Sequence, residues 1–209
     1  MIRAWAGGLL LTAALVGSHG GCASAPPPVA LTETWPSQAG DYDDVNAAWT
    51  RTATMRGPYQ QALEVHATFR SPEWRLAHAN REAGIRKLEG AARDALLAEA
   101  RTAAEGDYEV TLVVTTYDRS ENDLHRGDRS VWKVALVDDA GVETAPAKIT
   151  RDRRPPEILR AELATLGDFA TVYVARFPRT SAILHAGARK FALKMWSAKG
   201  GVELTWLAR

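Results

Sequence analysis

Apolar and polar residues alternate along much of the chain, and this pattern predicts β-strands. In the segment QALEVHATFR, residues 61–70, every second residue from Leu63 to Phe69 is apolar, which is typical of a half-buried strand. The same alternation occurs in KFALKMW (190–196) and in GVELTWL (201–207), on either side of a glycine-rich turn. We therefore expect a hairpin at this end of the sequence.

Four other segments are rich in β-branched and aromatic residues and are also predicted as strands. They are VNAAWTRTATM (45–55), YEVTLVVTTY (108–117), SVWKVALVDDAGVET (130–144, with a turn at 139–141) and DFATVYVARFP (168–178). The first ends at the turn signal Gly57-Pro58 and is expected to pair with 61–70. The segment PAKITRDRRPP (146–156) is expected to carry the preceding strand on to a proline stop.

One stretch has the composition of helix rather than strand. Ser71, Pro72 and an acidic first turn form a helix start, and the helix is predicted over about 72–104. A stripe of apolar residues at spacings of three and four predicts a buried face: Ile85, Leu88, Ala92, Leu96 and Ala100. Gly84 and Gly90 indicate two helices or one kinked helix. We interpret the segment as covering one side or end of a sheet; a partner-binding helix is the alternative.

About eight strands with one helical insertion favour an antiparallel β-sandwich, a mainly β fold of the α+β type. The layout resembles an immunoglobulin-like sandwich in architecture alone, because the Cys…Trp…Cys hallmark of true immunoglobulin domains is absent from the sequence. We expect a single domain over residues 41–209.

The N-terminal residues have the pattern of a secretory signal peptide. One cation, Arg3, precedes an apolar run from Ala4 to Val16, and small residues follow. The run is shorter than the roughly 20 apolar residues that span a bilayer. Residues 1–21 are therefore predicted as a leader, with an uncleaved anchor as the alternative.

The only cysteine of the chain follows this leader, in the stretch GGCASAPPP. The junction resembles the lipobox of bacterial lipoproteins, in which small residues precede a cysteine. The resemblance covers about the first 25 residues and implies cleavage between Gly21 and Cys22, with acyl chains such as palmitate on Cys22. The sequence departs from the family at His19, where an aliphatic residue is usual. An alternative cut after Ala25 would leave Pro26 first, where a proline ring fits poorly.

Proline-rich sequence after the cysteine predicts an extended tether over residues 22–40. Two or three acyl chains would hold the protein on its membrane. In bacterial lipoproteins an Asp after the cysteine favours the inner membrane, so Ala23 favours the outer membrane, facing the periplasm. Exposure at the cell surface is the alternative.

The net charge and the absence of catalytic or metal-binding motifs in the sequence argue against several classes of function. Without Arg3 the 26 basic residues become 25, equal to the 25 acidic residues, which argues against a nucleic-acid partner. The histidines show no paired ligand spacing and no nucleophile motif is present, so no metal, cofactor or catalytic residue is predicted. The loop 117–130 has oxygen ligands but no calcium pattern. The basic cluster RDRRPP (151–156) is able to meet an anionic ligand, but is interpreted as a solvated turn.

These observations predict a lipid-anchored lipoprotein of the bacterial cell envelope that acts as a non-catalytic interaction or structural module. Its expected partners are the membrane, through the anchor, and a protein or another envelope component. Two alternatives stay open: an envelope enzyme or accessory subunit with a site assembled from distant residues, and a carrier of an apolar ligand. A pocket with converging polar groups would favour the enzyme, and a dry apolar cavity the carrier.

Overall fold

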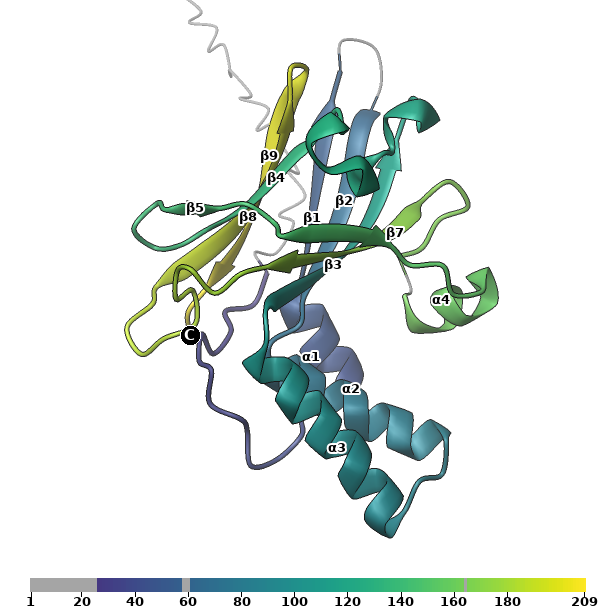
Figure 1. Cartoon of the computed structure of the whole chain (residues 1–209), viewed down its shortest axis with the longest axis vertical. Coiled ribbons are helices and arrows are strands. Elements are labelled where there is room, and N and C mark those ends of the chain that lie inside the picture. Colours follow the sequence, from purple (N-terminus) through teal and green to yellow (C-terminus); the bar gives the residue numbers. More distant parts are fainter. Residues whose placement is uncertain (1–25, 58–60, 164) are drawn as a thin grey trace, which may run out of the picture.

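Two antiparallel sheets pack face to face to form the body of the protein (Figure 1). The computed structural model describes residues 26–57, 61–163 and 165–209. The first sheet has the order β1-β2-β3-β7-β6, with β1 Thr50–Arg56, β2 Gln61–Phe69, β3 Tyr108–Thr116, β7 Thr171–Phe177 and β6 Lys148–Arg151. The second has the order β5-β4-β8-β9, with β5 Glu143–Thr144, β4 Lys133–Val137, β8 Lys190–Ser197 and β9 Gly200–Leu207.

Helices lie at the ends and on the outer face of the sandwich. They are α1 (Tyr42–Trp49), α2 (Pro72–Ile85), α3 (Gly90–Glu105) and α4 (Pro156–Glu162), with two short 3-10 helices, η1 (Arg119–Glu121) and η2 (Leu124–Arg129). The α2–α3 hairpin projects from one end of the sandwich (Figure 1). Leu159 of α4 packs on Val113 and Val172, so α4 covers part of the outer face of the first sheet.

The core lies between the sheets and is built from alternate residues of each strand. The four apolar residues of β2 from Leu63 to Phe69 are all buried, as are Phe191, Leu193 and Met195 of β8. Phe69 meets Phe191 across the core with ring centroids 4.8 Å apart, and Phe191 stacks on Trp206 of β9 at the same spacing. The predicted sandwich-like α+β architecture is thereby confirmed.

Two segments that were predicted as strand differ from the sequence-based expectation, and the helix α4 was not predicted. Residues 45–49, predicted as strand, belong to α1, because the Asp41 side chain accepts hydrogen bonds from the amides of Asp43 and Asp44 and caps a helix there. The strand begins only at Thr50. The segment around 148–151 does not continue β5; it crosses to the other sheet as β6 and pairs with β7.

The predicted tether over 22–40 is wrong from Val29 onward. Val29 and Leu31 are buried in the core, and the Val29 amide donates to the carbonyl of Leu207 at 2.8 Å. Because these two apolar side chains are part of the buried core, the folded domain begins before residue 41. The leader, with Gly21 and Cys22, and Pro58 lie outside the described residues.

The helical insertion begins as predicted but packs differently. The Ser71 hydroxyl accepts from the Trp74 amide at 3.0 Å, and the chain divides into two helices between Ile85 and Gly90. All of α3 lies in the described part of the chain, and none of its side chains is buried. Ile85, the first residue of the expected stripe, is 62% exposed. α3 rests on α2 rather than on the sandwich, so this stripe does not face a core.

Candidate anion-binding groove

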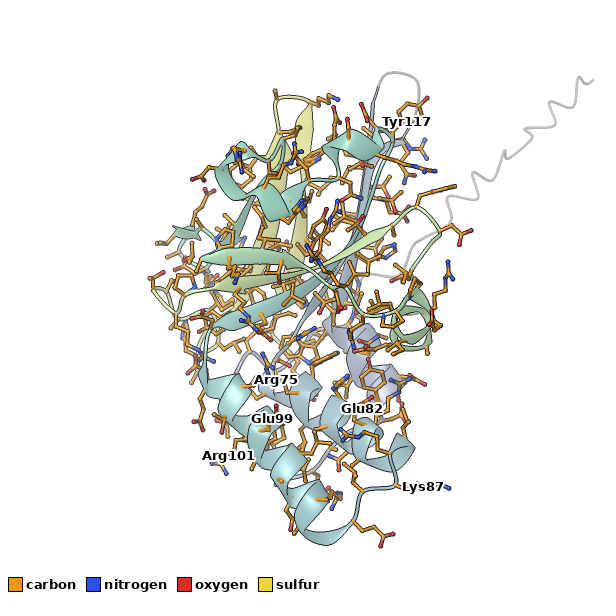
Figure 2. All side chains as sticks on the ribbon, turned by 45° about the vertical axis from the view of Figure 1, so that its right-hand side comes forward. Arg75, Glu82, Lys87, Glu99, Arg101 and Tyr117 are labelled. Atoms are coloured by element: carbon orange, nitrogen blue, oxygen red, sulfur yellow. The ribbon has the colours of Figure 1, made fainter. Side chains whose placement is uncertain are left out.

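A groove of about 760 Å³ lies between the α2–α3 hairpin and the outer face of β6 and β7. Its lining includes six arginines: Arg70, Arg75, Arg151, Arg153, Arg154 and Arg176. Figure 2 shows Arg75 where the hairpin meets the sheets, whereas Lys87 lies in the loop at the far end of the hairpin. The groove therefore combines residues that are distant in sequence.

Three of these arginines converge on one carboxylate, that of Glu109 on β3. Arg75 Nη2 donates to Oε2 at 2.8 Å, Arg70 Nη1 donates to the same oxygen at 3.2 Å, and Arg176 Nε donates to Oε1 at 2.7 Å. Arg176 lies directly opposite Glu109 in the β3–β7 register. We call these four residues the Arg–Glu109 cluster.

Local structure holds the cluster in place. The Arg70 amide donates to the Glu109 carbonyl at 2.9 Å, which extends the β2–β3 pairing by one residue. The side chain of Arg70 also donates to Thr111 Oγ1, and Arg75 Nε donates to the Arg70 carbonyl. Because Ser71 caps α2 directly after Arg70, the helix begins at a defined place and presents Arg75 one turn later.

The cluster carries a surplus of positive charge. Burial raises the pKa of Glu109, but the hydrogen bond from Arg75 and the charges of Arg70 and Arg75 outweigh it and hold this pKa below its ordinary value. The carboxylate is thus ionised at neutral pH. Burial is also the main influence on Arg75, and it lowers the pKa of its guanidinium. Three guanidinium groups around one carboxylate leave two positive charges uncompensated within the cluster.

A second charged group borders the same groove and joins α2, α4 and the turn after β6. His78 Nε2 donates to Glu162 Oε1 at 3.1 Å, and Arg154 Nη1 contacts Glu162 Oε2 at 2.5 Å. Arg154 also donates to Asp152. Burial raises the pKa of Glu162, but the hydrogen bond from His78 and the charge of Arg154 outweigh it and lower this pKa to about 2.

The opposite wall of the groove contains small apolar side chains as well as charged ones. It includes Leu96, Ala100 and Ala103 of α3 and Ala79 of α2. Glu82 of α2 and Glu99 of α3 also line this wall. A ligand in the groove would therefore contact cations on one side, and small apolar side chains and two carboxylates on the helix side.

One side chain of the groove has the surroundings of a general base. His78 is stacked on Trp74 with ring centroids 4.7 Å apart and is held by Glu162, as a general base would be. Among the described residues of the lining, Thr150 is the only one with a hydroxyl, and no hydrogen bond joins it to His78. The described lining thus contains no nucleophile activated by a base.

The sequence-based interpretation of the basic cluster as a solvated turn is incomplete, because Arg151, Asp152, Arg153 and Arg154 all line the groove. Sequence reasoning missed Arg70, Arg75, Arg176 and Glu109. These four are spread from residue 70 to residue 176 and form no motif, so no local signal marks them.

The remaining candidate residues are scattered over the fold. His66 lies in β2, His125 in η2 and His185 in the connection between β7 and β8. The described residues contain no group of three or more His, Cys, Asp or Glu side chains arranged to hold a metal ion. In the loop 117–130, Asn122 is buried and accepts a hydrogen bond from the Tyr173 hydroxyl, so part of that loop belongs to the packed structure.

Comparison of the chain with models of known protein families, with curated proteins and with solved structures found no match. Within the described ranges, no helix combines the length and the apolar character needed to cross a membrane.

Proposed function

We propose that the protein is a lipid-anchored lipoprotein of the bacterial cell envelope, processed between Gly21 and Cys22, whose folded domain is a non-catalytic binding module. The groove beside the Arg–Glu109 cluster is its ligand site. The observation that carries this proposal is the convergence of three guanidinium groups on a single carboxylate at the wall of an open groove. A protein gains no stability from such a charge surplus by itself, but a bound anion would compensate it.

The anchor rests on the sequence alone, and the structure adds a geometric consequence. If Cys22 is the acylated first residue, residues 23–28 connect it to Val29, which is buried. Seven Cα steps span at most about 25 Å. The folded domain would therefore lie close to its membrane. We favour attachment to the outer membrane, with the domain facing the periplasm. An immunoglobulin-like character of the sandwich stays a prediction.

The envelope enzyme is the second candidate, and the His78–Glu162 pair supports it. The Glu162 carboxylate, however, is shared with Arg154, and the groove offers no partner nucleophile among its described lining residues. The apolar-ligand carrier gains no support, because six arginines line the groove.

The anchor is tested by a Cys22→Ala variant compared with a matched Ser24→Ala control, both expressed as the full chain. We expect Cys22→Ala to abolish incorporation of labelled palmitate and to move the protein to the soluble fraction or stall its precursor. Ser24→Ala should remain acylated and membrane-bound. Unchanged acylation of Cys22→Ala would refute the lipoprotein assignment. Separation of inner and outer membranes then gives the location.

A further inference from the structure

We infer that the groove recognises a phosphomonoester group of its ligand, held by the guanidinium groups of Arg70, Arg75 and Arg176. The inference rests on the proposed function only in taking the groove as the ligand site. It names the chemical class that the site accepts and does not depend on the lipid anchor.

Charge is the first argument. The cluster has two uncompensated positive charges, since Glu109 neutralises one of its three arginines. A phosphomonoester carries about −1.5 to −2 at neutral pH, because its second pKa is near 6. A single carboxylate or a phosphodiester brings only one negative charge. A phosphomonoester therefore matches the surplus of the Arg–Glu109 cluster more closely than either of them. Elsewhere in the lining, Glu82, Glu99, Asp152 and Glu162 offset Arg151, Arg153 and Arg154, so the surplus that faces the ligand is that of the cluster.

Hydrogen-bond capacity is the second argument. Arg176 uses only Nε on Glu109, so its Nη1 and Nη2 have no acceptor among the described residues. Arg70 Nη2 and Arg75 Nη1 likewise have no acceptor within the described part of the chain. Four donor nitrogens on three planar guanidinium groups suit an anion with three strong acceptor oxygens.

Preorganisation is the third argument. The side chain of Arg75 is 9% exposed and that of Arg70 is 19% exposed, and both are fixed by hydrogen bonds to Glu109 and to the backbone or Thr111. The Arg70 guanidinium also lies 5.6 Å from the centre of the Trp74 ring. Arginines that are already ordered lose little side-chain entropy when an anion binds.

The rest of the groove indicates what the phosphate is attached to. The basic turn after β6 contributes Arg153, which has no ion-pair partner among the described residues, while Leu96 and Ala100 of α3 form an apolar surface beside the carboxylate of Glu99. A phosphate on a sugar or on a glycerolipid would place its carbon skeleton against this surface. Both sources share the phosphomonoester, and the experiment separates them.

Binding is measured by calorimetry on the mature full chain in nonionic detergent. The soluble probes are inorganic phosphate and glucose 6-phosphate, with glucose as the uncharged control. The lipid probes are mixed micelles of the same detergent with phosphatidic acid, a monoester, or phosphatidylglycerol, a diester. We expect saturable one-to-one binding of phosphomonoesters and none of glucose. Preference for phosphatidic acid over glucose 6-phosphate assigns the lipid source, and the reverse assigns a soluble one.

Arg176→Gln is the central variant, because the Arg176 side chain is 56% exposed and its removal leaves Arg70 and Arg75 on Glu109. It should weaken phosphomonoester binding by about tenfold or more, the effect of losing one charge-assisted contact. Arg176→Lys should recover part of this loss. The matched control is Arg189→Gln, an arginine that is 84% exposed and pairs with Asp139 away from the groove. It should change affinity by less than about twofold.

Absence of saturable binding by every phosphomonoester probe up to about 10 mM would overturn the inference, as would equal affinities of Arg176→Gln and Arg189→Gln variants. Stronger binding of phosphatidylglycerol than of phosphatidic acid would also overturn it, because the diester lacks the second charge. None of these results bears on the lipid anchor, which the Cys22→Ala variant tests separately. Equally, a failure of the anchor test would not affect the assignment of the groove as a phosphomonoester site.

Discussion

Glu109 and Arg176 lie directly opposite each other in the β3–β7 register, and Arg176 Nε donates to Glu109 Oε1 at 2.7 Å. Because Arg70 and Arg75 reach the same carboxylate from the start of α2, this strand pair is joined to the helical hairpin through one acidic side chain. Glu109 is thus both the partner of three cations, of which Arg176 is exposed, and the residue that limits the positive charge of the groove.

Replacement of Glu109 by Gln should destabilise the fold. The change leaves three neighbouring guanidinium groups without their carboxylate, and we expect the free energy of unfolding to fall by about 2–4 kcal/mol. Urea denaturation measures this effect, with Glu203→Gln on the exposed side of β9 as the control. Millimolar phosphate should restore part of the lost stability of Glu109→Gln. Equal stability of the two variants would contradict the role of Glu109.

Acid should remove the contribution of Glu162. Its folded-state pKa of about 2 lies below the ordinary value of 4.5, so its stabilising effect is complete above about pH 5 and is lost as pH falls towards 2. Wild type should exceed Glu162→Gln by about 2–3 kcal/mol at pH 7, and the two should converge near pH 2. Chemical denaturation at several pH values measures this. Glu157→Gln, an exposed carboxylate on α4, should follow wild type throughout.

Two glycines of the helical hairpin should respond to alanine in opposite directions. A Cβ at Gly84 meets no atom within 4 Å, whereas Gly90 has φ +52°, a conformation that L-residues rarely adopt. Gly84→Ala should raise the free energy of unfolding by about 0.5–1 kcal/mol, because alanine has the higher helix propensity. Gly90→Ala should lower it by about 1 kcal/mol. Thermal melts monitored by far-UV circular dichroism distinguish these outcomes from a common response.

Arg51 should prove essential for attachment of the N-terminal segment. It is buried, and its guanidinium donates to four backbone carbonyls, including those of Pro27 and Thr205. Arg51→Met leaves these acceptors without donors and should reduce stability by about 2–4 kcal/mol. The same substitution at Arg56, an exposed position of β1, is the control. Limited proteolysis should cut residues 26–31 faster in Arg51→Met than in Arg56→Met; equal rates would contradict this role.

Much of the sheet structure follows from local sequence. The segments around 61–69, 108–116 and 171–177 and the hairpin β8–β9 are strands as predicted, and the Ser71 cap begins α2 as predicted. These predictions succeed because alternation and capping involve neighbouring residues. The strand predicted over residues 45–49 fails because β-branched and aromatic composition competes there with the Asp41 cap, and packing of Val45 and Trp49 into the core supports the helix.

The sequence by itself determined most of the strands and the start of α2, and it contains a lipobox-like junction at Cys22. The tertiary structure alone decided that the stripe on α3 does not face a core, that Val29 enters one, and that Arg70, Arg75 and Arg176 meet at Glu109. The spacing of apolar residues along a helix indicates that one face is apolar, but it does not indicate which element packs against that face. The Arg–Glu109 cluster depends on the β3–β7 register and on the chain reversal from β2 into α2, and such long-range pairings leave no local pattern in a single sequence.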